Sequence, residues 1–180
     1  NEVIVSIVAV RAALTGHMVF STLHTNDAPS TATRLIDMGV EPFLVASSLR
    51  GVIAQRLVRR ICDQCKVQDH PTDAILQGLH MDPEEVRDYT FYKGAGCTEC
   101  NNTGYRGRVG LYELMEVDPR VRDAIANNDQ RAIEQALEQQ ESHHSLRAAG
   151  VEKAMEGLTS LEEILRVTAE EEEMVEIEAG

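Results

Sequence analysis

The sequence contains no tryptophan, and aromatic residues make up only 4% of its 180 residues. Its hydrophobic content of 43% can still bury a core, so that core must be built from valine, leucine, isoleucine, alanine and methionine. No run of about eighteen apolar residues occurs, which argues against a membrane-spanning helix. An initiator methionine and a basic leader are also missing, so we expect a fragment of a longer protein that carries no secretory signal peptide.

Positive charge is scarce as well, because 17 basic residues face 30 acidic ones and leave a formal net charge of −13. A surface of this sign repels nucleic acids and anionic membranes, which argues against a nucleic-acid-binding function. The charge is uneven along the chain. Residues 169–180 form an acidic tail that we expect to be solvated, whereas the stretch from Arg50 to Arg60 is basic.

The first sixty residues predict alternating helices and strands. A β-branched segment that runs into Gly16 reads as a helix, and the apolar run 18–23 reads as a buried central strand. Two further helices are predicted, one capped by Asn26 or Asp27, and one begun by Pro42 with Leu44, Val45, Ser48, Leu49, Val52 and Ile53 on its buried side. This order indicates an α/β layer, in which ligands bind where strands end.

The region from Cys62 to Cys100 has a different character, with frequent proline, glycine and aspartate and weak apolar periodicity. We expect helices there only near 72–79 and 83–88. A segment with so little apolar periodicity needs a cross-link or staple, such as a bound metal, to be stable. A strand over 107–115 follows. The remainder is predicted to be helical, including helices that begin at Asp118-Pro119, cover 146–155, and start after a capping box at Thr159 or Ser160.

The staple is supplied by four cysteines, arranged as two CxxC pairs, Cys62 with Cys65 and Cys97 with Cys100, separated by 31 residues. Two such turns provide the four-sulfur tetrahedral shell that Zn²⁺ accepts, and four thiolates leave no open position for a catalytic water. A structural zinc site is therefore the favoured interpretation. The alternatives are a thioredoxin-like redox pair, which needs only one CxxC, and disulfides, which are disfavoured without a secretory signal.

Two histidines flank the predicted strand, His17 before it and His24 after it. A lone histidine beside an apolar run is most often a packed, hydrogen-bonded residue. His24 lies within Thr22-Leu-His-Thr-Asn26, however, where hydroxyls, an imidazole and an amide converge at a strand end. That combination suits recognition of a phosphate or a polarised water.

Together these residues resemble a known family. Leu14-Thr-Gly-His17 followed by Ser21-Thr-Leu-His-Thr-Asn26 is similar to the histidine box of the type II secretion and type IV pilus assembly ATPases. The two CxxC pairs, and Gly104-Tyr-Arg-Gly-Arg-Val-Gly-Leu-Tyr-Glu113 after the second pair, also resemble that family. Gly157-Leu-Thr-Ser-Leu-Glu-Glu-Ile-Leu-Arg-Val-Thr168 resembles its closing helix.

The resemblance implies an α/β fold made of the C-terminal part of a RecA-like P-loop domain, a zinc-binding insertion and a small helical terminal domain. The expected segments are 1–61, 62–117, 118–168 and the tail 169–180. The family assembles as a homo-hexamer on the cytoplasmic face of the bacterial inner membrane and moves a membrane platform protein, with no nucleic acid involved. Its box histidines correspond to His17 and His24, which face the γ-phosphate, and its zinc ligands correspond to the four cysteines.

One departure from the family bears on activity. The sequence contains no GxxxxGK[ST] phosphate loop, so ATP and Mg²⁺ belong to the complete protein and this chain alone should be inactive. Arg56, Arg106 and Arg108 could reach a neighbouring subunit. The alternatives are a zinc-stapled docking module for a membrane platform, a nucleic-acid-binding zinc ribbon, and a retraction motor, a branch that generally lacks the cysteine pairs. The sequence does not choose between secretion and pilus assembly.

Overall fold

The computed structural model describes residues 2–84 and 86–169, so the acidic tail beyond Ala169 lies outside the described residues. These residues form two compact units. Unit 1 combines Asn1–Ala54 with Glu113–His144, and unit 2 combines Gln55–Tyr112 with Ser145–Gly180. Within the described part, no helix has both the length and the apolar character needed to cross a bilayer. The division into four segments stays a prediction about the complete protein.

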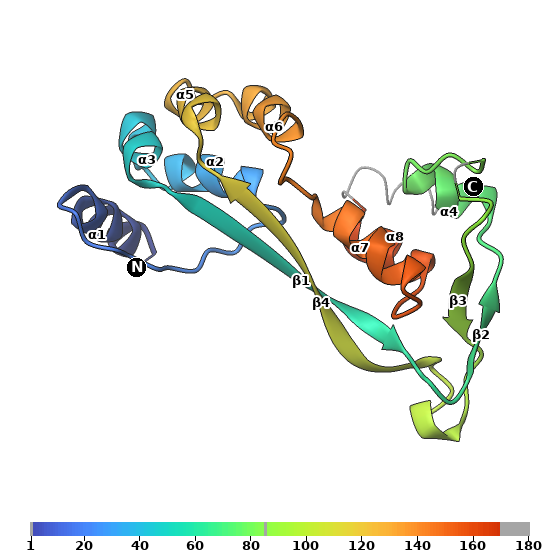
Figure 1. Cartoon of the computed structure of the whole chain (residues 1–180). Coiled ribbons are helices and arrows are strands. Elements are labelled where there is room, and N and C mark those ends of the chain that lie inside the picture. Colours follow the sequence, from blue (N-terminus) through green and yellow to red (C-terminus); the bar gives the residue numbers. More distant parts are fainter. Residues whose placement is uncertain (1, 85, 170–180) are drawn as a thin grey trace. The chain divides into compact units, whose positions relative to one another are not determined.

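Unit 1 is a group of helices shown in blue and orange in Figure 1. Its helices are α1 (Glu2–Leu14), α2 (Pro29–Asp37), α3 (Pro42–Ser48), α5 (Pro119–Ala126) and α6 (Gln130–Glu138). Helix α3 packs against α1 and α5, and α2 packs against α3 and α6. The core between them consists of fully buried aliphatic side chains, among them Val45, Val121, Ile125, Ile133 and Leu137.

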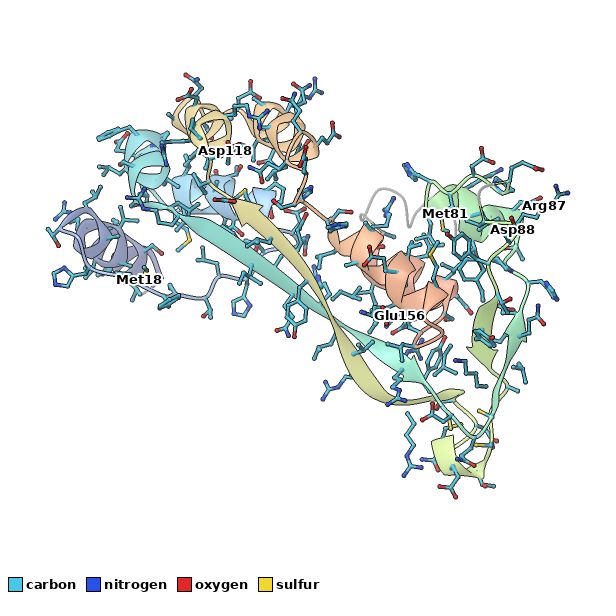
Figure 2. All side chains as sticks on the ribbon, viewed as in Figure 1. Met18, Met81, Arg87, Asp88, Asp118 and Glu156 are labelled. Atoms are coloured by element: carbon cyan, nitrogen blue, oxygen red, sulfur yellow. The ribbon has the colours of Figure 1, made fainter. Side chains whose placement is uncertain are left out.

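The helix boundaries in unit 1 follow the predicted signals. The Asp27 carboxylate accepts a hydrogen bond of 2.8 Å from the backbone N–H of Ser30, as a cap does. Gly39 follows α2 with a φ of +87°, a conformation that favours glycine. Asp118 accepts from the N–H of Val121 at 2.9 Å and stands at the beginning of α5 (Figure 2). These helices are fixed by local chemistry that the sequence displays.

The central strand predicted over 18–23 is wrong for this chain, because residues 17–25 have no regular secondary structure. Their apolar side chains are exposed, with Met18 at 78% and Phe20 at 91%, and Figure 2 shows Met18 extending away from the ribbon. A strand requires backbone partners, and none of the strands in the described residues pairs with this segment. Apolar pattern alone therefore did not determine its conformation.

The predicted helix after Pro42 ends earlier than expected. It stops at Ser48, and Val52 and Ile53 belong instead to strand β1 (Gly51–Ile61). Burial alternates along this strand, with Ala54 and Val58 buried while Ile53 is 69% exposed. The β-branched residues favour a strand, and the period of two in their burial is that of a pleated ribbon rather than a helix.

Two strand pairs contribute to unit 2, one of them only through residues 55–61 and 105–112. Strand β1 pairs with β4 (Tyr105–Glu116), which extends the predicted strand 107–115 at both ends, and β2 (Lys66–Asp69) pairs with β3 (Phe91–Gly94). Its helices are α4 (Asp73–Gly78), α7 (Leu146–Met155) and α8 (Leu161–Thr168), and α8 packs against α4 and α7. Strands β2 and β3 were not predicted. The helix expected over 83–88 is wrong, since its described residues form turns.

A buried carboxylate joins α8 to β1 within unit 2. The Glu163 side chain is fully buried and accepts hydrogen bonds from the backbone N–H of Arg59 at 2.9 Å and from the guanidinium groups of Arg59 and Arg166, each at 2.7 Å. The Arg59 guanidinium also lies 4.2 Å from the centre of the Tyr105 ring. Ser160 caps α8, because its hydroxyl accepts from the N–H of Glu163. The predicted capping box at Ser160 forms only in this half, since the Glu163 carboxylate binds Arg59 and Arg166.

Candidate functional site

The four cysteines form a compact cluster in unit 2, with their sulfur atoms all within 4.8 Å of one another. The Sγ–Sγ distances are 3.9 Å for Cys62–Cys97, 3.8 Å for Cys65–Cys100 and 3.7 Å for Cys97–Cys100. A tetrahedral zinc ion with Zn–S bonds of about 2.3 Å requires edges of about 3.8 Å between its sulfurs. The cluster therefore has the dimensions of a four-thiolate zinc shell. It is far too open for a disulfide, and all four cysteines are free.

The strands bring the two CxxC turns together. In the β2–β3 pair Lys66 lies opposite Gly94, and the next backbone contact joins Ala95 N–H to the Cys65 carbonyl at 2.9 Å. At the end of β1, the Cys62 N–H donates to the carbonyl of Gly104 at 2.9 Å. Each turn is therefore anchored to the other by backbone hydrogen bonds, and cysteines 35 positions apart in the sequence come together.

Two glycines make this approach sterically feasible. A Cβ atom on Gly94 would overlap the backbone carbonyl of Gly104, and Gly104 itself has a φ of +77°. Side chains at either position would force the backbones apart, because neither backbone group can swing away as a flexible side chain could. Both glycines are visible in the sequence, but their role depends on the backbone contact between Gly94 and Gly104. Residue spacing alone does not predict that contact.

The cluster also contains hydrogen bonds that favour a thiolate. The Cys100 sulfur accepts from the backbone N–H groups of Cys97 and Gly104, both at 3.3 Å. Burial disfavours ionisation of this thiol, but these two N–H groups together with the thiols of Cys97 and Cys65 outweigh burial and lower the pKa of Cys100 to about 6. Burial raises the pKa of Cys65 to about 12. A lowered pKa favours the thiolate form of Cys100, which is the form that a metal ligand needs.

The two box histidines lie in unit 1, both exposed. The Nδ1 atom of His17 is 3.0 Å from the Thr15 hydroxyl. His24 lines an open hollow of about 470 Å³ that does not include His17. The structure therefore places the histidines in separate surroundings, and His24 is the one beside a space that a ligand can enter.

Several residues of this hollow were missed in the sequence. The outer positions of α2 line it at helical spacing: Ser30, Thr33, Arg34 and Asp37. Gln130 joins them from the beginning of α6 and accepts a hydrogen bond from the Thr33 hydroxyl. The helical spacing of the polar residues in α2 is visible in the sequence and could have indicated that they share one face. Gln130 is distant in sequence, and no pattern links it to them.

A second missed residue is Glu113, which is buried in unit 1. Its carboxylate accepts from the backbone N–H of Ala28 at 2.9 Å and lies 3.1 Å from Nε2 of His143. Because Ala28 immediately precedes α2, Glu113 fixes the place where the His24 segment joins that helix. His143, which the polar pattern of its segment does not single out, is a partner of this carboxylate.

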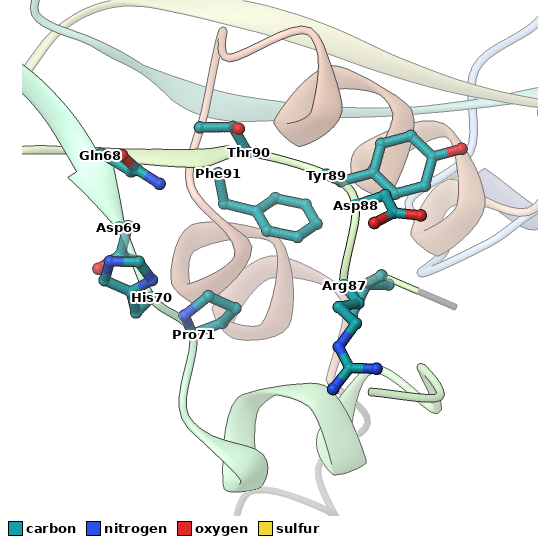
Figure 3. Close-up of a pocket in the computed structure, with 10 residues that line it drawn as sticks. Gln68, Asp69, His70, Pro71, Arg87, Asp88, Tyr89, Thr90 and Phe91 are labelled. Atoms are coloured by element: carbon teal, nitrogen blue, oxygen red, sulfur yellow. The ribbon is translucent and has the colours of Figure 1, made fainter. Parts of the chain in front are cut away.

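A smaller cavity of about 290 Å³ lies in unit 2 between the end of β2 and the beginning of β3. Figure 3 shows Phe91 inside it, with His70 and Pro71 on one side and Arg87 and Asp88 on the other. Its charged groups carry both signs and do not converge on one point. We assign it no ligand.

Comparison with known proteins decides the family. The family described as "Type II/IV secretion system protein" matches residues 2–166. This chain belongs to that family. The resemblance read from the histidine box and the cysteine pairs is confirmed.

The relatives include proteins from both branches. The type IV pilus assembly ATPase PilB of Thermus thermophilus is 44% identical over 163 residues, which cover 91% of this chain and 18% of the relative. The type II secretion system protein E of Aeromonas hydrophila is 47% identical over 165 residues, covering 91% of this chain and 32% of the relative. The chain thus spans a third or less of these relatives' length.

A solved structure supports the fold. The pilus retraction motor PilT with bound ADP has a TM-score of 0.59 and 23% sequence identity, covering 94% of this chain and 38% of that one. At this identity the likeness shows the fold alone. The prediction of an α/β fold is therefore confirmed, whereas the zinc-binding insertion and the helical terminal domain stay predictions.

Proposed function

We propose that this chain is the C-terminal part of a cytoplasmic ATPase that drives type IV pilus assembly or type II protein secretion. The observation that carries the proposal is the 44–47% identity to an assembly ATPase and to a secretion protein E. The cysteine pairs favour these branches over retraction motors. ATP hydrolysis supplies the energy for assembly or secretion. The histidine segment of this chain responds to the nucleotide, and the cysteine cluster stabilises the fold.

The exposed apolar side chains of unit 1 support a larger core. Met18 and Phe20 project from a segment without strand partners, and Ile4, Val5 and Val8 are exposed on α1. Contiguous exposed apolar surface marks a face that another part of a protein covers. In the complete protein, we infer, these side chains are covered by the sheet that carries the phosphate loop.

In that arrangement His24 acts at the nucleotide. Its imidazole stands at the edge of an open polar hollow with Asn26 and Arg34, groups that hydrogen-bond phosphate oxygens. ATP and Mg²⁺ are held by residues outside this sequence. The role of His24 is to donate a hydrogen bond to the γ-phosphate region as charge develops during hydrolysis, and His17 lies at the other end of the same segment.

The cysteine cluster holds a structural Zn²⁺ ion, which supplies no catalytic chemistry because four thiolates close its shell. Cys62, Cys65, Cys97 and Cys100 bind it, and the N–H donors to Cys100 orient that ligand. The sulfur spacing supports zinc, since three Sγ–Sγ distances of 3.7–3.9 Å match the edge of about 3.8 Å of a tetrahedral shell.

The complete protein acts as a homo-hexamer at the cytoplasmic face of the inner membrane and contacts a membrane platform protein. Its attachment to the membrane runs through partners. Nucleic acid is not a partner, since the net charge of −13 opposes it.

Replacing His24 by alanine in the complete protein tests the nucleotide role. We expect kcat for ATP hydrolysis to fall about 100-fold, the usual effect of removing one donor to developing charge, with little change in KM. The matched control is His144→Ala, another exposed histidine of unit 1, which should leave kcat unchanged. Undiminished turnover in the His24→Ala protein would contradict the proposed role, and absence of ATP hydrolysis in the unmodified protein would favour a docking module.

A further inference from the structure

One buried carboxylate joins three segments of unit 1. Glu113 lies near the end of β4, and its side chain is only 4% exposed. Its Oε2 atom accepts a hydrogen bond of 2.9 Å from the backbone N–H of Ala28, and its Oε1 atom lies 3.1 Å from Nε2 of His143. Ala28 immediately precedes α2, and His143 follows α6. Glu113 therefore links the end of β4 to the beginning of α2 and to the segment after α6.

The helices that Glu113 joins also line the hollow beside His24. Outer positions of α2 and Gln130 at the beginning of α6 line it together with residues 24–26. Glu113 itself is not one of the lining residues. It therefore does not contact a ligand in the hollow, but it holds the beginning of α2 and the segment that follows α6, the two helices that supply the wall.

The hydrogen bond to Ala28 matters because this residue is fully buried, at 0% exposed. The first N–H groups of a helix have no acceptor within the helix, and a buried N–H that is left without a partner costs free energy. The Asp27 side chain serves a later group, since it accepts from the N–H of Ser30. Glu113 therefore supplies, from 85 positions away in the sequence, the acceptor that fixes where α2 begins.

The position of His24 depends on the same anchor. Residues 17–25 have no regular secondary structure, so the attachments that follow His24 determine where its imidazole lies. The Thr25 hydroxyl lies 3.0 Å from the hydroxyl of Thr31 in the first turn of α2, and the beginning of that helix is held by Glu113. A shift of the beginning of α2 would therefore move Thr25 and the adjoining His24 with it.

We propose that Glu113 is a positioning residue for ATP hydrolysis, which acts through His24 by fixing the beginning of α2. The inference rests on the nucleotide role proposed for His24. Glu113 contacts neither the nucleotide nor the reacting atoms, and its carboxylate acts on the backbone. A misplacement of about 1 Å at a reacting group can lower a rate about 100-fold. An anchor four residues from His24 can therefore affect turnover without contacting ATP.

A double-mutant cycle in the complete protein tests this role. The proteins compared are the native protein, Glu113→Leu, His24→Ala and the double variant. Leucine is similar in size to glutamate but cannot accept from the Ala28 N–H. We expect Glu113→Leu to lower kcat for ATP hydrolysis about tenfold and to change KM by less than about twofold. In the His24→Ala background it should lower kcat by less than about twofold, because the group that it positions is already missing.

Hydrogen exchange measures the anchor directly in this chain. Glu113→Leu should increase the exchange rate of the Ala28 amide at least tenfold, because its N–H loses its acceptor. The matched control is Glu116→Gln, an exposed carboxylate on the same strand, which should leave this rate unchanged. Unchanged exchange in Glu113→Leu, or an equal increase in both variants, would show that Glu113 does not hold the beginning of α2 and would overturn the proposal.

The kinetic outcomes separate this inference from the proposed function. An equal fall of kcat in both backgrounds would show a general structural effect and would overturn the positioning role of Glu113 alone. An unchanged kcat in Glu113→Leu would overturn it as well, and the role of His24 would stand. Undiminished turnover in the His24→Ala protein would instead contradict the nucleotide role, and the positioning role with it.

A second variant covers the case in which leucine prevents folding. Glu113→Gln then replaces Glu113→Leu in both measurements, since glutamine keeps one oxygen for the Ala28 N–H and loses only the charge. Because a charged acceptor is roughly twice as strong as a neutral one, we expect smaller effects, about threefold on kcat and on the exchange of the Ala28 amide. The effect on kcat should again disappear in the His24→Ala background. No effect of Glu113→Gln, or an equal effect in both backgrounds, would overturn the proposal.

Discussion

Replacing Cys62 by serine should release the metal and unfold the β2–β3 part of unit 2. The four sulfurs lie within 4.8 Å of one another, and a serine hydroxyl does not replace a thiolate in a zinc shell. The free energy of zinc binding to such sites is about 10–16 kcal/mol and is folding free energy. The short strands β2 and β3 form only a two-stranded sheet, which is marginal without support.

This loss is measured by hydrogen exchange of the backbone amides of β2 and β3, together with the zinc content. We expect protection of these amides to fall at least 100-fold, equivalent to about 2.7 kcal/mol or more. The matched control is Thr98→Ser, an exposed position in the second CxxC turn that leaves all four thiols in place. A Cys62→Ser chain that keeps native protection would show that the cluster does not hold this region together.

Replacing Glu163 by glutamine should lower the free energy of unfolding by about 3 kcal/mol. The carboxylate is fully buried and binds two guanidinium groups and a backbone N–H. Glutamine keeps the shape but loses the charge, so two arginines lose their partner at the junction of α8 and β1. Glu162→Gln, an exposed neighbour on the same helix, is the control and should change stability by less than about 0.5 kcal/mol.

The same substitution should change how stability depends on pH. Burial disfavours ionisation of Glu163, but hydrogen bonds from Arg166 and Arg59 outweigh burial and lower its pKa from 4.5 to about 2. A depressed pKa means that the carboxylate stabilises the fold fully above pH 4.5, and that this contribution disappears as pH falls from 4.5 towards 2. Urea unfolding at pH 7 and pH 3 should show a smaller acid-induced loss for Glu163→Gln than for the native chain. Equal losses would contradict this account of Glu163.

Much of the helical structure could be read from the sequence because its signals are local. Asp118 with Pro119, and Ser160 before α8, specify helix beginnings through contacts within one turn. The four cysteines could likewise be grouped in advance, because two CxxC pairs have few uses. These features depend on residues that are neighbours in the sequence.

The errors fall where a conformation depends on distant partners. Residues 18–23 look like a buried strand, but a strand forms only when other strands pair with it. Strands β2 and β3 lack a clear apolar pattern, and the cysteine turns and the contact of Gly94 with Gly104 bring them together. Glu113 could not be predicted for the same reason, because its hydrogen-bond partners Ala28 and His143 are both distant in sequence.

The account depends most directly on the cluster of four thiols being one metal site. Elemental analysis of the purified chain, with thiol titration before and after denaturation, measures this. We expect about one zinc ion for each chain and four thiols that react only after the metal is removed or the chain is unfolded. A chain that is folded, contains no metal and has four readily reactive thiols would contradict the account.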